Sequence, residues 1–396
     1  MTIDLSTITF TNEADIVPES GQEDIVNTGI ANTLAGNDTI TGSGGVKGIS
    51  NSGMFDTAEG NDRISGSGVS DGIINTGTFN TAEGNDIIFG GGQSGSGIEN
   101  IGTFNTGEGN DIITTWGRER GIDNTGTFNT ADGDDVITAS SRFEGLLIHK
   151  GSILDTGDGN DRIRAQTITG IINSSFSFNT GDGDDTIEGI GSFTGISNSG
   201  LINTGNGKDT IIFEAGTYFP SGRGLSNFST IATGDDDDII TGRGGIENKG
   251  TIDTGSGNDS IMADNFFLHT DSTINTGDGK DIITSSNGIK NDGTINTGNG
   301  ADSIIANGGF SGMGSVFLGN GKDYLNGFGT GKFNGGKHQD TLELTSGSYT
   351  VGRSATTVSF TKSGVIMETS EFEKLIAGNT TYLFTNLMDG QTIVVA

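Results

Sequence analysis

Thirteen variants of one phrase, Thr-Gly-x-Gly-Asn-Asp-x-Ile, recur between residues 36 and 323 of this 396-residue chain, with clear copies beginning at Thr106 and Thr156. The aspartates of successive copies are 24 to 26 residues apart in the first half, 29 residues apart once, and 21 to 22 residues apart in the second half. A repeat of this length that ends in a strand-forming residue indicates a solenoid, in which each repeat forms one coil.

One repeat contains three short extended segments, for example residues 72–75, 78–81 and 86–89, separated by turns rich in Gly and Asn. This pattern predicts an all-β protein: a parallel β-helix or β-roll solenoid of about 13 coils, each of 21–26 residues, with terminal caps. Because crossover connections between parallel strands are nearly always right-handed, we expect a right-handed solenoid.

Alignment of the repeats predicts columns of stacked side chains along the solenoid. The apolar columns run through Ile49, Ile73, Ile98, Ile122, Leu147 and Ile171, through Phe55, Phe79, Phe104, Phe128 and Phe178, and through Ile64, Ile88, Ile113 and Ile137. A polar column runs through Asn51, Asn75, Asn100 and Asn124, and His149 falls in the same column. Stacked amides can donate and accept along the axis, so we interpret the asparagines as structural.

The phrase divides the chain into a cap at residues 1–31, repeats at 32–326 and a C-terminal β cap at 327–396. The net charge of −31 argues against nucleic acid or an anionic membrane as a partner, because phosphate binding needs Lys and Arg. The chain has no Cys, and therefore no disulfide or zinc-thiolate site. We find no N-terminal signal pattern and no apolar run of spanning length, so we expect an intracellular protein or one exported without such a signal.

One aspartate recurs at the same point of every coil, so these carboxylates must form a column. Like charges cannot stack without a counter-charge, which predicts cations between the coils. The glycines beside the aspartates allow the turn backbone to present carbonyl oxygens. Carboxylate and carbonyl oxygens are the ligands that Ca²⁺ prefers, six to eight at a time.

These copies, such as Ala58-Glu59-Gly60-Asn61-Asp62-Arg63-Ile64, resemble the RTX family of hemolysin-type calcium-binding repeats in secreted bacterial proteins. The family pattern is Gly-Gly-x-Gly-x-Asp-x-hydrophobic-x, and the resemblance covers residues 32–326. It implies several Ca²⁺ ions stacked between coils. The implied ligands are the carboxylates of Asp38, Asp62, Asp86, Asp111, Asp135, Asp161, Asp185, Asp209, Asp238, Asp259, Asp281, Asp302 and Asp323, and the carbonyls of turns containing Gly60, Gly84, Gly107, Gly109, Gly133, Gly157, Gly159, Gly181, Gly183, Gly205, Gly207, Gly255, Gly257, Gly277, Gly279, Gly298 and Gly300.

The chain departs from the family pattern in having one phrase per coil, so one calcium column is expected instead of two. Acids between the two glycines, at Glu59, Glu83, Glu108 and Asp158, are either extra ligands or a solvated acidic edge. Asn206, Ser256, Asn299 and Asn320 stand at the same position without the acid, so we expect the C-terminal sites to bind more weakly.

No motif indicates an enzyme. His-Glu-x-x-His is absent, and Gly68-Val69-Ser70-Asp71-Gly72 matches a hydrolase pattern only within a Gly- and Ser-rich repeat that lacks the strand-turn-helix context. A polysaccharide-acting β-helix is an alternative, although the faces are poor in Arg. Ice binding is another, because Thr76-Gly77-Thr78 and Thr125-Gly126-Thr127 can order water, but Met54, Ile101 and Lys150 interrupt that pattern.

The sequence therefore predicts a secreted, non-enzymatic protein whose folding is coupled to calcium, with a structural, surface or adhesive role outside the cell. The expected partners are calcium ions, with cell-surface polysaccharide or a second copy of the chain as further candidates. The C-terminal region resembles the tail of RTX proteins, which implies an uncleaved type I secretion signal. No nucleic-acid partner and no membrane span are expected.

Overall fold

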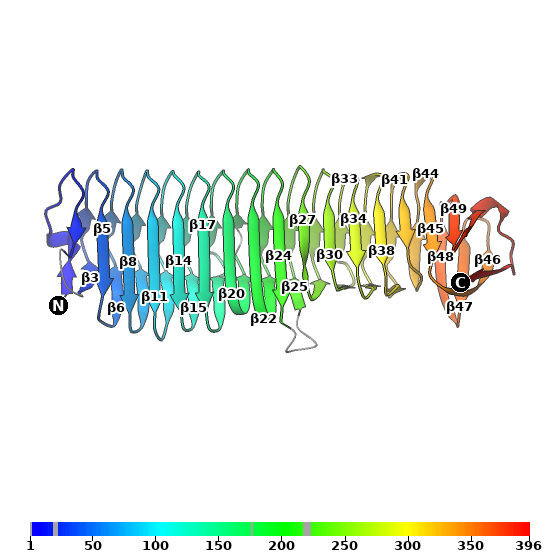
Figure 1. The fold of residues 1–396 in the computed structure, drawn as a ribbon, viewed down its shortest axis with the longest axis horizontal. Coiled ribbons are helices and arrows are strands. Elements are labelled where there is room, and N and C mark those ends of the chain that lie inside the picture. Colours follow the sequence, from blue (N-terminus) through cyan, green and yellow to red (C-terminus); the bar gives the residue numbers. More distant parts are fainter. Residues whose placement is uncertain (1, 19–22, 176, 217–222) are drawn as a thin grey trace. The chain divides into compact units, whose positions relative to one another are not determined.

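A computed structural model describes residues 2–18, 23–175, 177–216 and 223–396. These residues form short strands and two 3-10 helices, η1 (Leu5–Thr7) and η2 (Phe384–Asn386), neither of which is long or apolar enough to cross a membrane. The chain divides into unit 1, residues 1–206 with 210–222, and unit 2, residues 207–209 with 223–396. Within each unit, successive coils stack through parallel strands (Figure 1), which confirms the predicted parallel β-solenoid.

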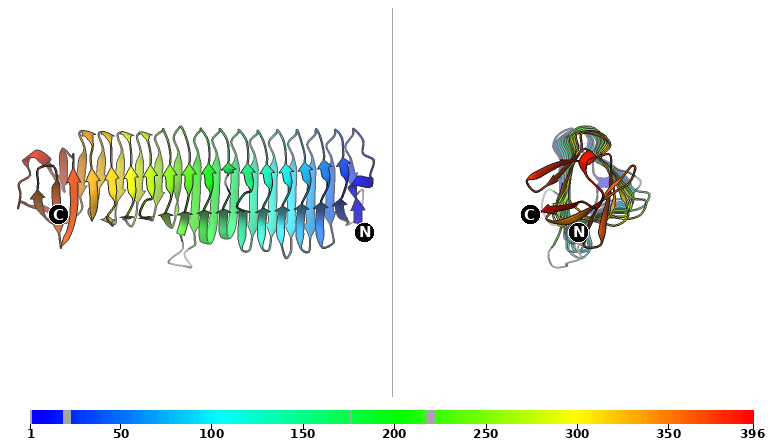
Figure 2. Two further views of the ribbon diagram at one scale, coloured as in Figure 1. Left: turned by 180° about the vertical axis from the view of Figure 1, so that it is seen from behind. Right: turned by 90° about the vertical axis from the view of Figure 1, so that its right-hand side faces the viewer.

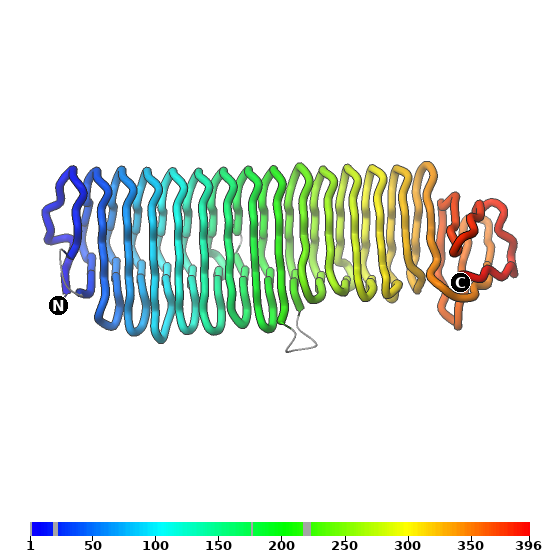
Figure 3. Tube along the Cα trace, in the orientation of Figure 1, coloured from blue at the N-terminus to red at the C-terminus, as the bar shows by residue number. Residues whose placement is uncertain are grey.

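The chain of unit 1 runs through successive coils (Figure 3), and most of these coils contribute three strands in order. The first series is β5 (Thr39–Ser43), β8 (Arg63–Gly68), β11 (Ile87–Gly92), β14 (Ile112–Gly117), β17 (Val136–Ser141) and β24 (Thr210–Ala215). The second is β3 (Asp24–Asn27), β6 (Lys47–Asn51), β9 (Asp71–Asn75), β12 (Ser96–Asn100), β15 (Arg120–Asn124) and β18 (Glu144–Ile148). In β20 (Arg162–Asn173) and β22 (Thr186–Asn198) the first two strands are continuous.

The third series of unit 1 consists of three-residue strands whose middle residue is buried. It runs through β4 (Ile30–Asn32), β7 (Met54–Asp56), β10 (Thr78–Asn80), β13 (Thr103–Asn105), β16 (Thr127–Asn129), β19 (Ile153–Asp155), β21 (Ser177–Asn179) and β23 (Leu201–Asn203). The N-terminal strands β1 (Thr2–Asp4) and β2 (Ile16–Val17) pair in parallel with β3 and β5, so they already belong to the sheets of unit 1.

The phenylalanine column of unit 1 is confirmed. The rings of Phe79 and Phe104 stack with centroids 4.5 Å apart, and those of Phe104 and Phe128 with centroids 4.6 Å apart. All three side chains are fully buried, and Leu154 takes the place of Phe in the next coil before the column continues at Phe178. The parallel register brings identical side chains into contact, so the sequence repeat becomes a continuous core.

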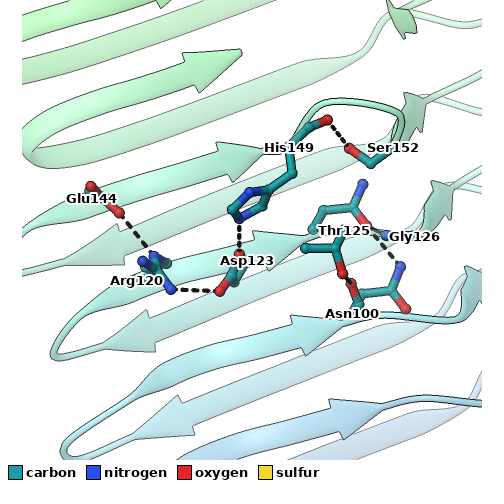
Figure 4. Close-up of polar contacts among 9 residues, drawn as sticks. Asn100, Arg120, Asp123, Thr125, Gly126, Glu144, His149 and Ser152 are labelled. Carbon is teal, nitrogen blue, oxygen red and sulfur yellow. Dashed lines mark hydrogen bonds and ion pairs between the residues drawn. The ribbon is translucent and has the colours of Figure 1, made fainter. Parts of the chain in front are cut away.

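The isoleucine column differs from the prediction at one coil. Leu146, not Leu147, pairs with Ile122, and Ile148 occupies the place in the asparagine column that we assigned to His149. The repeat from Asp135 to Asp161 is 26 residues long, and its extra residues lie in a turn after β18, which shifts the alignment. His149 instead places its Nε2 2.8 Å from Oδ1 of Asp123 (Figure 4).

The asparagine column is a ladder of buried side-chain hydrogen bonds. Asn100 Nδ2 donates to Asn124 Oδ1 (2.9 Å) and to the carbonyl of Thr127 (2.7 Å). Its own Oδ1 accepts from Asn75 Nδ2 (2.9 Å). Each amide therefore joins three coils, and it also fixes the turn that precedes the third strand.

Replacing Asn100 by Ala should destabilise the fold by about 2–4 kcal/mol, because the Asn75 amide and the Thr127 carbonyl would lose their partners in a dry interior. Chemical denaturation measures this change. The matched control is Asn105→Ala, which removes the half-exposed asparagine of β13, whose groups water can satisfy. Equal losses for the two variants would contradict a special role for the buried ladder.

Unit 2 repeats the arrangement with shorter strands. Its first series is β27 (Ile239–Arg243), β30 (Ser260–Ala263), β34 (Ile282–Ser285), β38 (Ser303–Ala306), β42 (Tyr324–Asn326), β45 (Thr341–Leu344) and β49 (Lys374–Ala377). The second is β25 (Arg223–Asn227), β28 (Gly245–Asn248), β31 (Asn265–Leu268), β35 (Ile289–Asn291) and β39 (Phe310–Ser311). The third is β26 (Thr230–Ala232), β29 (Thr251–Asp253), β32 (Thr273–Asn275), β36 (Thr294–Asn296), β40 (Ser315–Phe317) and β43 (Gly331–Asn334).

Unit 2 also contains a fourth series, made by the turns themselves. It consists of β33 (Asp278–Gly279), β37 (Asn299–Gly300), β41 (Asn320–Gly321) and β44 (Lys337–His338). After the last coils the strands change direction: β46 (Gly347–Arg353), β47 (Val358–Lys362), β48 (Val365–Ser370), β50 (Thr380–Leu383) and β51 (Thr392–Val395) form antiparallel pairs, drawn in red and orange in Figure 2. Antiparallel strands at this end shield the last coil from edge-to-edge pairing.

Candidate functional site

The predicted aspartates form one hydrogen-bonded column within each unit. In unit 1, the backbone N–H of Asp62 donates to Oδ1 of Asp86 (2.7 Å), and that of Asp86 donates to Oδ1 of Asp111 (2.8 Å). Unit 2 has the same bond from Asp281 N–H to Oδ1 of Asp302 (2.9 Å). Each aspartate stands two residues before a buried isoleucine or leucine, so alternation in the extended chain turns its side chain inward.

These carboxylates are buried, and one oxygen of most of them is left without a hydrogen-bond donor. The thirteen aspartates are only 0 to 2% exposed, although carboxylates usually lie at the protein surface. Among the described residues, no donor reaches Oδ2 of Asp38, Asp62, Asp86, Asp111, Asp135 or Asp161 in unit 1, or Oδ2 of Asp238, Asp259, Asp281, Asp302, Asp323 or Asp340 in unit 2. Buried polar atoms are nearly always satisfied, so a whole column of exceptions requires an explanation.

The nearest hydroxyls do not supply that donor. A buried threonine opens the first twelve phrases, and Leu318 opens the thirteenth. In most of them the single hydroxyl proton of the threonine goes to the carbonyl of the corresponding residue in the next coil: Thr57 donates to Thr81 (3.3 Å) and Thr81 donates to Thr106 (3.0 Å). The hydroxyl still lowers the pKa of the neighbouring aspartate slightly. This lowering of the pKa is smaller than the rise that burial causes.

Burial dominates the titration of the column. It raises the pKa of Asp62, Asp86 and Asp161 from 3.8 to about 7, and that of Asp135 to about 8, while the adjacent N–H and hydroxyl groups lower it less. Neighbouring aspartates add charge repulsion, which raises the pKa of Asp135 further. At neutral pH the column therefore needs either protons or cations to be neutral.

The turns beside the column place carbonyl oxygens between coils. All of the predicted glycines have positive φ, from +79° to +156°. A Cβ atom on Gly109 would lie 1.7 Å from the carbonyl oxygen of Gly84, and one on Gly107 would lie 1.8 Å from that of Ala82. These carbonyls point along the solenoid toward the next turn, so glycine fits best over them, although Ala58, Ala82 and Ala131 take the first of the two positions in three turns.

The oxygens present suit a hard cation such as Ca²⁺. No group of three or more His, Cys, Asp or Glu side chains in the described part of the chain is placed to hold a metal, so side chains alone do not make a site. The turns from Asp38 to Asp161 and from Asp238 to Asp323 nevertheless supply the free Oδ2 of an aspartate together with main-chain carbonyls. A donor set of carboxylate and carbonyl oxygens, without nitrogen or sulfur, fits Ca²⁺ better than zinc or other transition metals.

The acids between the two glycines lie on the solvent side of the turn. Glu59, Glu83 and Glu108 are exposed, and so is Asp158, whose Oδ1 accepts the N–H of Asp182 (3.1 Å). Exposure of these acids is compatible with both interpretations from the sequence, extra ligands or a solvated acidic edge.

Sequence reasoning missed three members of the column, at its ends. The N–H of Asp15 donates to Oδ1 of Asp38 (2.7 Å), and the N–H of Asp323 donates to Oδ1 of Asp340 (2.9 Å). Asp340 in turn donates its N–H to Oε2 of Glu373 (2.7 Å). Asp15 lacks the flanking glycines, whereas Asp340 keeps the first of them, Gly336, and has His338 in place of the second; an apolar residue, Val17 or Leu342, follows two positions later in both.

Comparison with known proteins adds little to this geometry. No protein-family model matches the sequence, and no curated protein matches it. A similar solved structure is the X-ray crystal structure of a hyperactive, Ca²⁺-dependent, β-helical antifreeze protein from an Antarctic bacterium. The two chains are 16% identical over 85% of this chain and 78% of that one, with a TM-score of 0.41, a likeness too weak to support an argument about function.

Proposed function

We propose that this chain is a calcium-stabilised β-solenoid without enzymatic activity, with a structural, surface or adhesive role. The observation that supports the proposal is the column of buried Oδ2 atoms that no donor satisfies. Isolated buried carboxylates are costly unless they are paired or bound to metal. A divalent cation between successive turns would neutralise two of them at once.

The residues that would hold the ion are the column aspartates and the turn carbonyls. In the space between the turns of Asp86 and Asp111, these are the two carboxylates and the carbonyls of Ala82 and Gly84, which point toward the turn of Asp111. Bound calcium supplies positive charge and a cross-link between coils. The protein supplies positioned oxygens, and its glycines keep the turn open enough to present them.

Coupling between calcium and folding favours a place of action where calcium is abundant. Modules that work outside cells bind calcium with dissociation constants of about 10⁻⁴–10⁻³ M, which leaves them empty in a calcium-poor compartment. We therefore place this protein outside the cell or on its surface. Export through a type I route belongs to the same proposal.

Isothermal titration of the metal-free chain with calcium tests the proposal directly. We expect uptake of several ions per chain, accompanied by a gain in β-sheet circular dichroism, with magnesium as the control ion. Magnesium is a poor substitute because it requires near-ideal octahedral geometry and gives up water reluctantly. A metal-free chain with its full β signal and no calcium uptake would overturn the proposal.

A second candidate function is ice binding, which a specific surface of unit 1 favours. In strands β10, β13 and β16, Thr78, Thr103 and Thr127 form one outward row and the asparagines two residues later form another. The asparagines bond to one another along the row, as in the 2.7 Å bond from Asn105 Nδ2 to Asn80 Oδ1. A shallow groove runs between the two rows. Regular rows at the strand spacing of about 4.8 Å can hold ordered water.

Thermal hysteresis and ice recrystallisation assays test this candidate. Thr103→Tyr places a bulky ring in the middle of the groove and should abolish any activity at ice surfaces. Thr138→Tyr, on the outward face of β17 away from this surface, is the matched control. Absence of activity in the unmodified chain would eliminate ice binding without affecting the calcium proposal.

A further inference from the structure

The turns of the two units are hydrogen-bonded differently. In unit 2 the N–H between the two glycines donates to the first glycine carbonyl of the preceding turn. The bonds are Ser256 to Gly234 (3.1 Å), Asp278 to Gly255 (3.2 Å), Asn299 to Gly277 (2.9 Å), Asn320 to Gly298 (2.8 Å) and Lys337 to Gly319 (2.8 Å). These bonds produce the strand series β33, β37, β41 and β44, so the turn backbone of unit 2 is a small parallel sheet.

The corresponding carbonyls of unit 1 accept no such bond. Among the described residues, no N–H donates to the carbonyl of Ala82, Gly107 or Ala131. Where the intervening residue is aspartate, its side chain takes the next N–H instead, as Asp132 Oδ1 does from Asp158 (3.1 Å). In unit 2 the side chains of Asn299 and Asn320 bond to each other, which leaves their backbone N–H groups to the carbonyls.

This difference changes the number of oxygens that a cation can use. A space between two turns of unit 1, from Asp38 to Asp161, is bordered by two carboxylates with a free Oδ2 and by the two carbonyls that point into it from the preceding turn, four oxygens in all. In unit 2 the first of these carbonyls accepts a hydrogen bond, so the same space has three such oxygens. Ca²⁺ takes six to eight oxygens, so water must complete the shell in both units and supplies more of it in unit 2.

The charge beside the later turns of unit 2, after the four aspartates at residues 235–238, changes in the same direction. In unit 1 an acid stands between the glycines of every complete phrase from Glu59 to Asp182, and the residue before the column aspartate is Asn or Asp. In unit 2 the residue before the column aspartate is lysine in two turns, at Lys280 and Lys322. In the turn of Lys322, Asn320 stands between the two glycines. A nearby ammonium group repels a divalent cation and lowers its local concentration.

We propose that the turns of unit 1 bind calcium at least tenfold more tightly than those of unit 2, whose turns are held together by their own hydrogen bonds. This inference rests on the proposed function, because it assumes that the aspartate column binds calcium at all. The seven aspartates of unit 1, from Asp38 to Asp185, enclose six spaces between turns. The tight phase of a calcium titration should therefore contain about six ions.

Two matched double variants of the full chain test the inference by calorimetry. Asp86→Asn with Asp111→Asn disrupts three adjacent spaces of unit 1 and should remove about half of the tight phase. Asp281→Asn with Asp302→Asn makes the same chemical change in unit 2 and should leave the tight phase unchanged. Equal losses from both variants would overturn the inference while supporting calcium binding, and no uptake by the unmodified chain would overturn the proposed function itself.

Hydrogen exchange of the unmodified chain gives an answer even if a variant fails to fold. Peptides are compared with calcium and after chelation, at neutral pH. Strands β11, β14 and β17 of unit 1 should lose protection on chelation, whereas β34, β38 and β42 of unit 2 should keep most of theirs. A uniform loss along both units would show that the two sets of turns bind calcium alike, and the inference would be wrong.

Discussion

Chelation of calcium at neutral pH should abolish most of the cooperative β structure of unit 1. Binding to the folded state alone stabilises it by about 2.7 kcal/mol for a site held at a hundred times its dissociation constant. Several such sites together match the whole stability of a typical domain, about 5–15 kcal/mol. Without the ion, the buried carboxylates from Asp38 to Asp161 repel one another and lack donors for Oδ2, and this repulsion opposes the stacking of the turns of unit 1.

Circular dichroism and calorimetry before and after addition of a chelator measure this loss. Excess calcium should restore the signal, because the chain contains no disulfide that could misform. Magnesium in the same excess is the control and should restore little. If the melting temperature is the same with and without calcium, calcium does not neutralise the aspartate column. Protonation of the carboxylates would then be the remaining explanation.

The metal-free chain should become less stable as the pH rises, opposite to the usual behaviour of paired carboxylates. Folding raises the pKa of Asp86, Asp161 and Asp238 from 3.8 to about 7, so the folded state binds more protons than the unfolded state between these values. The free energy of unfolding must then fall as pH rises through this window. The contribution is complete below the unfolded pKa of about 4 and is lost above the folded pKa.

Thermal melts of calcium-free protein at pH 5 and pH 8 check this expectation. Each unit by which folding raises a pKa corresponds to about 1.4 kcal/mol, and several aspartates act together, so the melting temperature should be higher at pH 5 by about 10 °C or more. Calcium should remove most of the difference in melting temperature between pH 5 and pH 8 for unit 1, because the ion neutralises the carboxylates in place of the protons. A melting temperature that rises with pH in the metal-free chain would contradict the burial of ionisable carboxylates.

The fold could be predicted largely because one phrase marks the same point of each coil. Alignment of the phrases correctly predicted that Phe79, Phe104 and Phe128 pair with one another, and that the asparagines beside them do the same. The prediction went wrong at Leu147 and His149, where a turn lengthens a coil between two copies of the phrase and counting from either copy gives a different answer. Insertions within turns leave no hydrophobic signal, so only the coordinates place them.

The candidate site was predictable in outline but not in its bonding. The sequence places the carboxylates in a column and the glycines beside them. It does not reveal that the N–H of one aspartate occupies Oδ1 of the next, which leaves Oδ2 alone to bind an ion. Nor does it reveal which turns are open: Asp132 and Asp278 stand at the same position of the phrase, yet Asp132 Oδ1 accepts the N–H of Asp158, whereas the N–H of Asp278 donates to the carbonyl of Gly255.

The stacked phenylalanines and asparagines of unit 1 have a consequence for how such a chain can evolve. Each coil presents to the next coil nearly the same side chains that it receives from the previous one. Removal or duplication of a whole coil therefore joins two surfaces that already match. Unequal recombination between repeats of the gene would change the length of the protein without disturbing its interior, so closely related chains should differ in size by whole multiples of one coil.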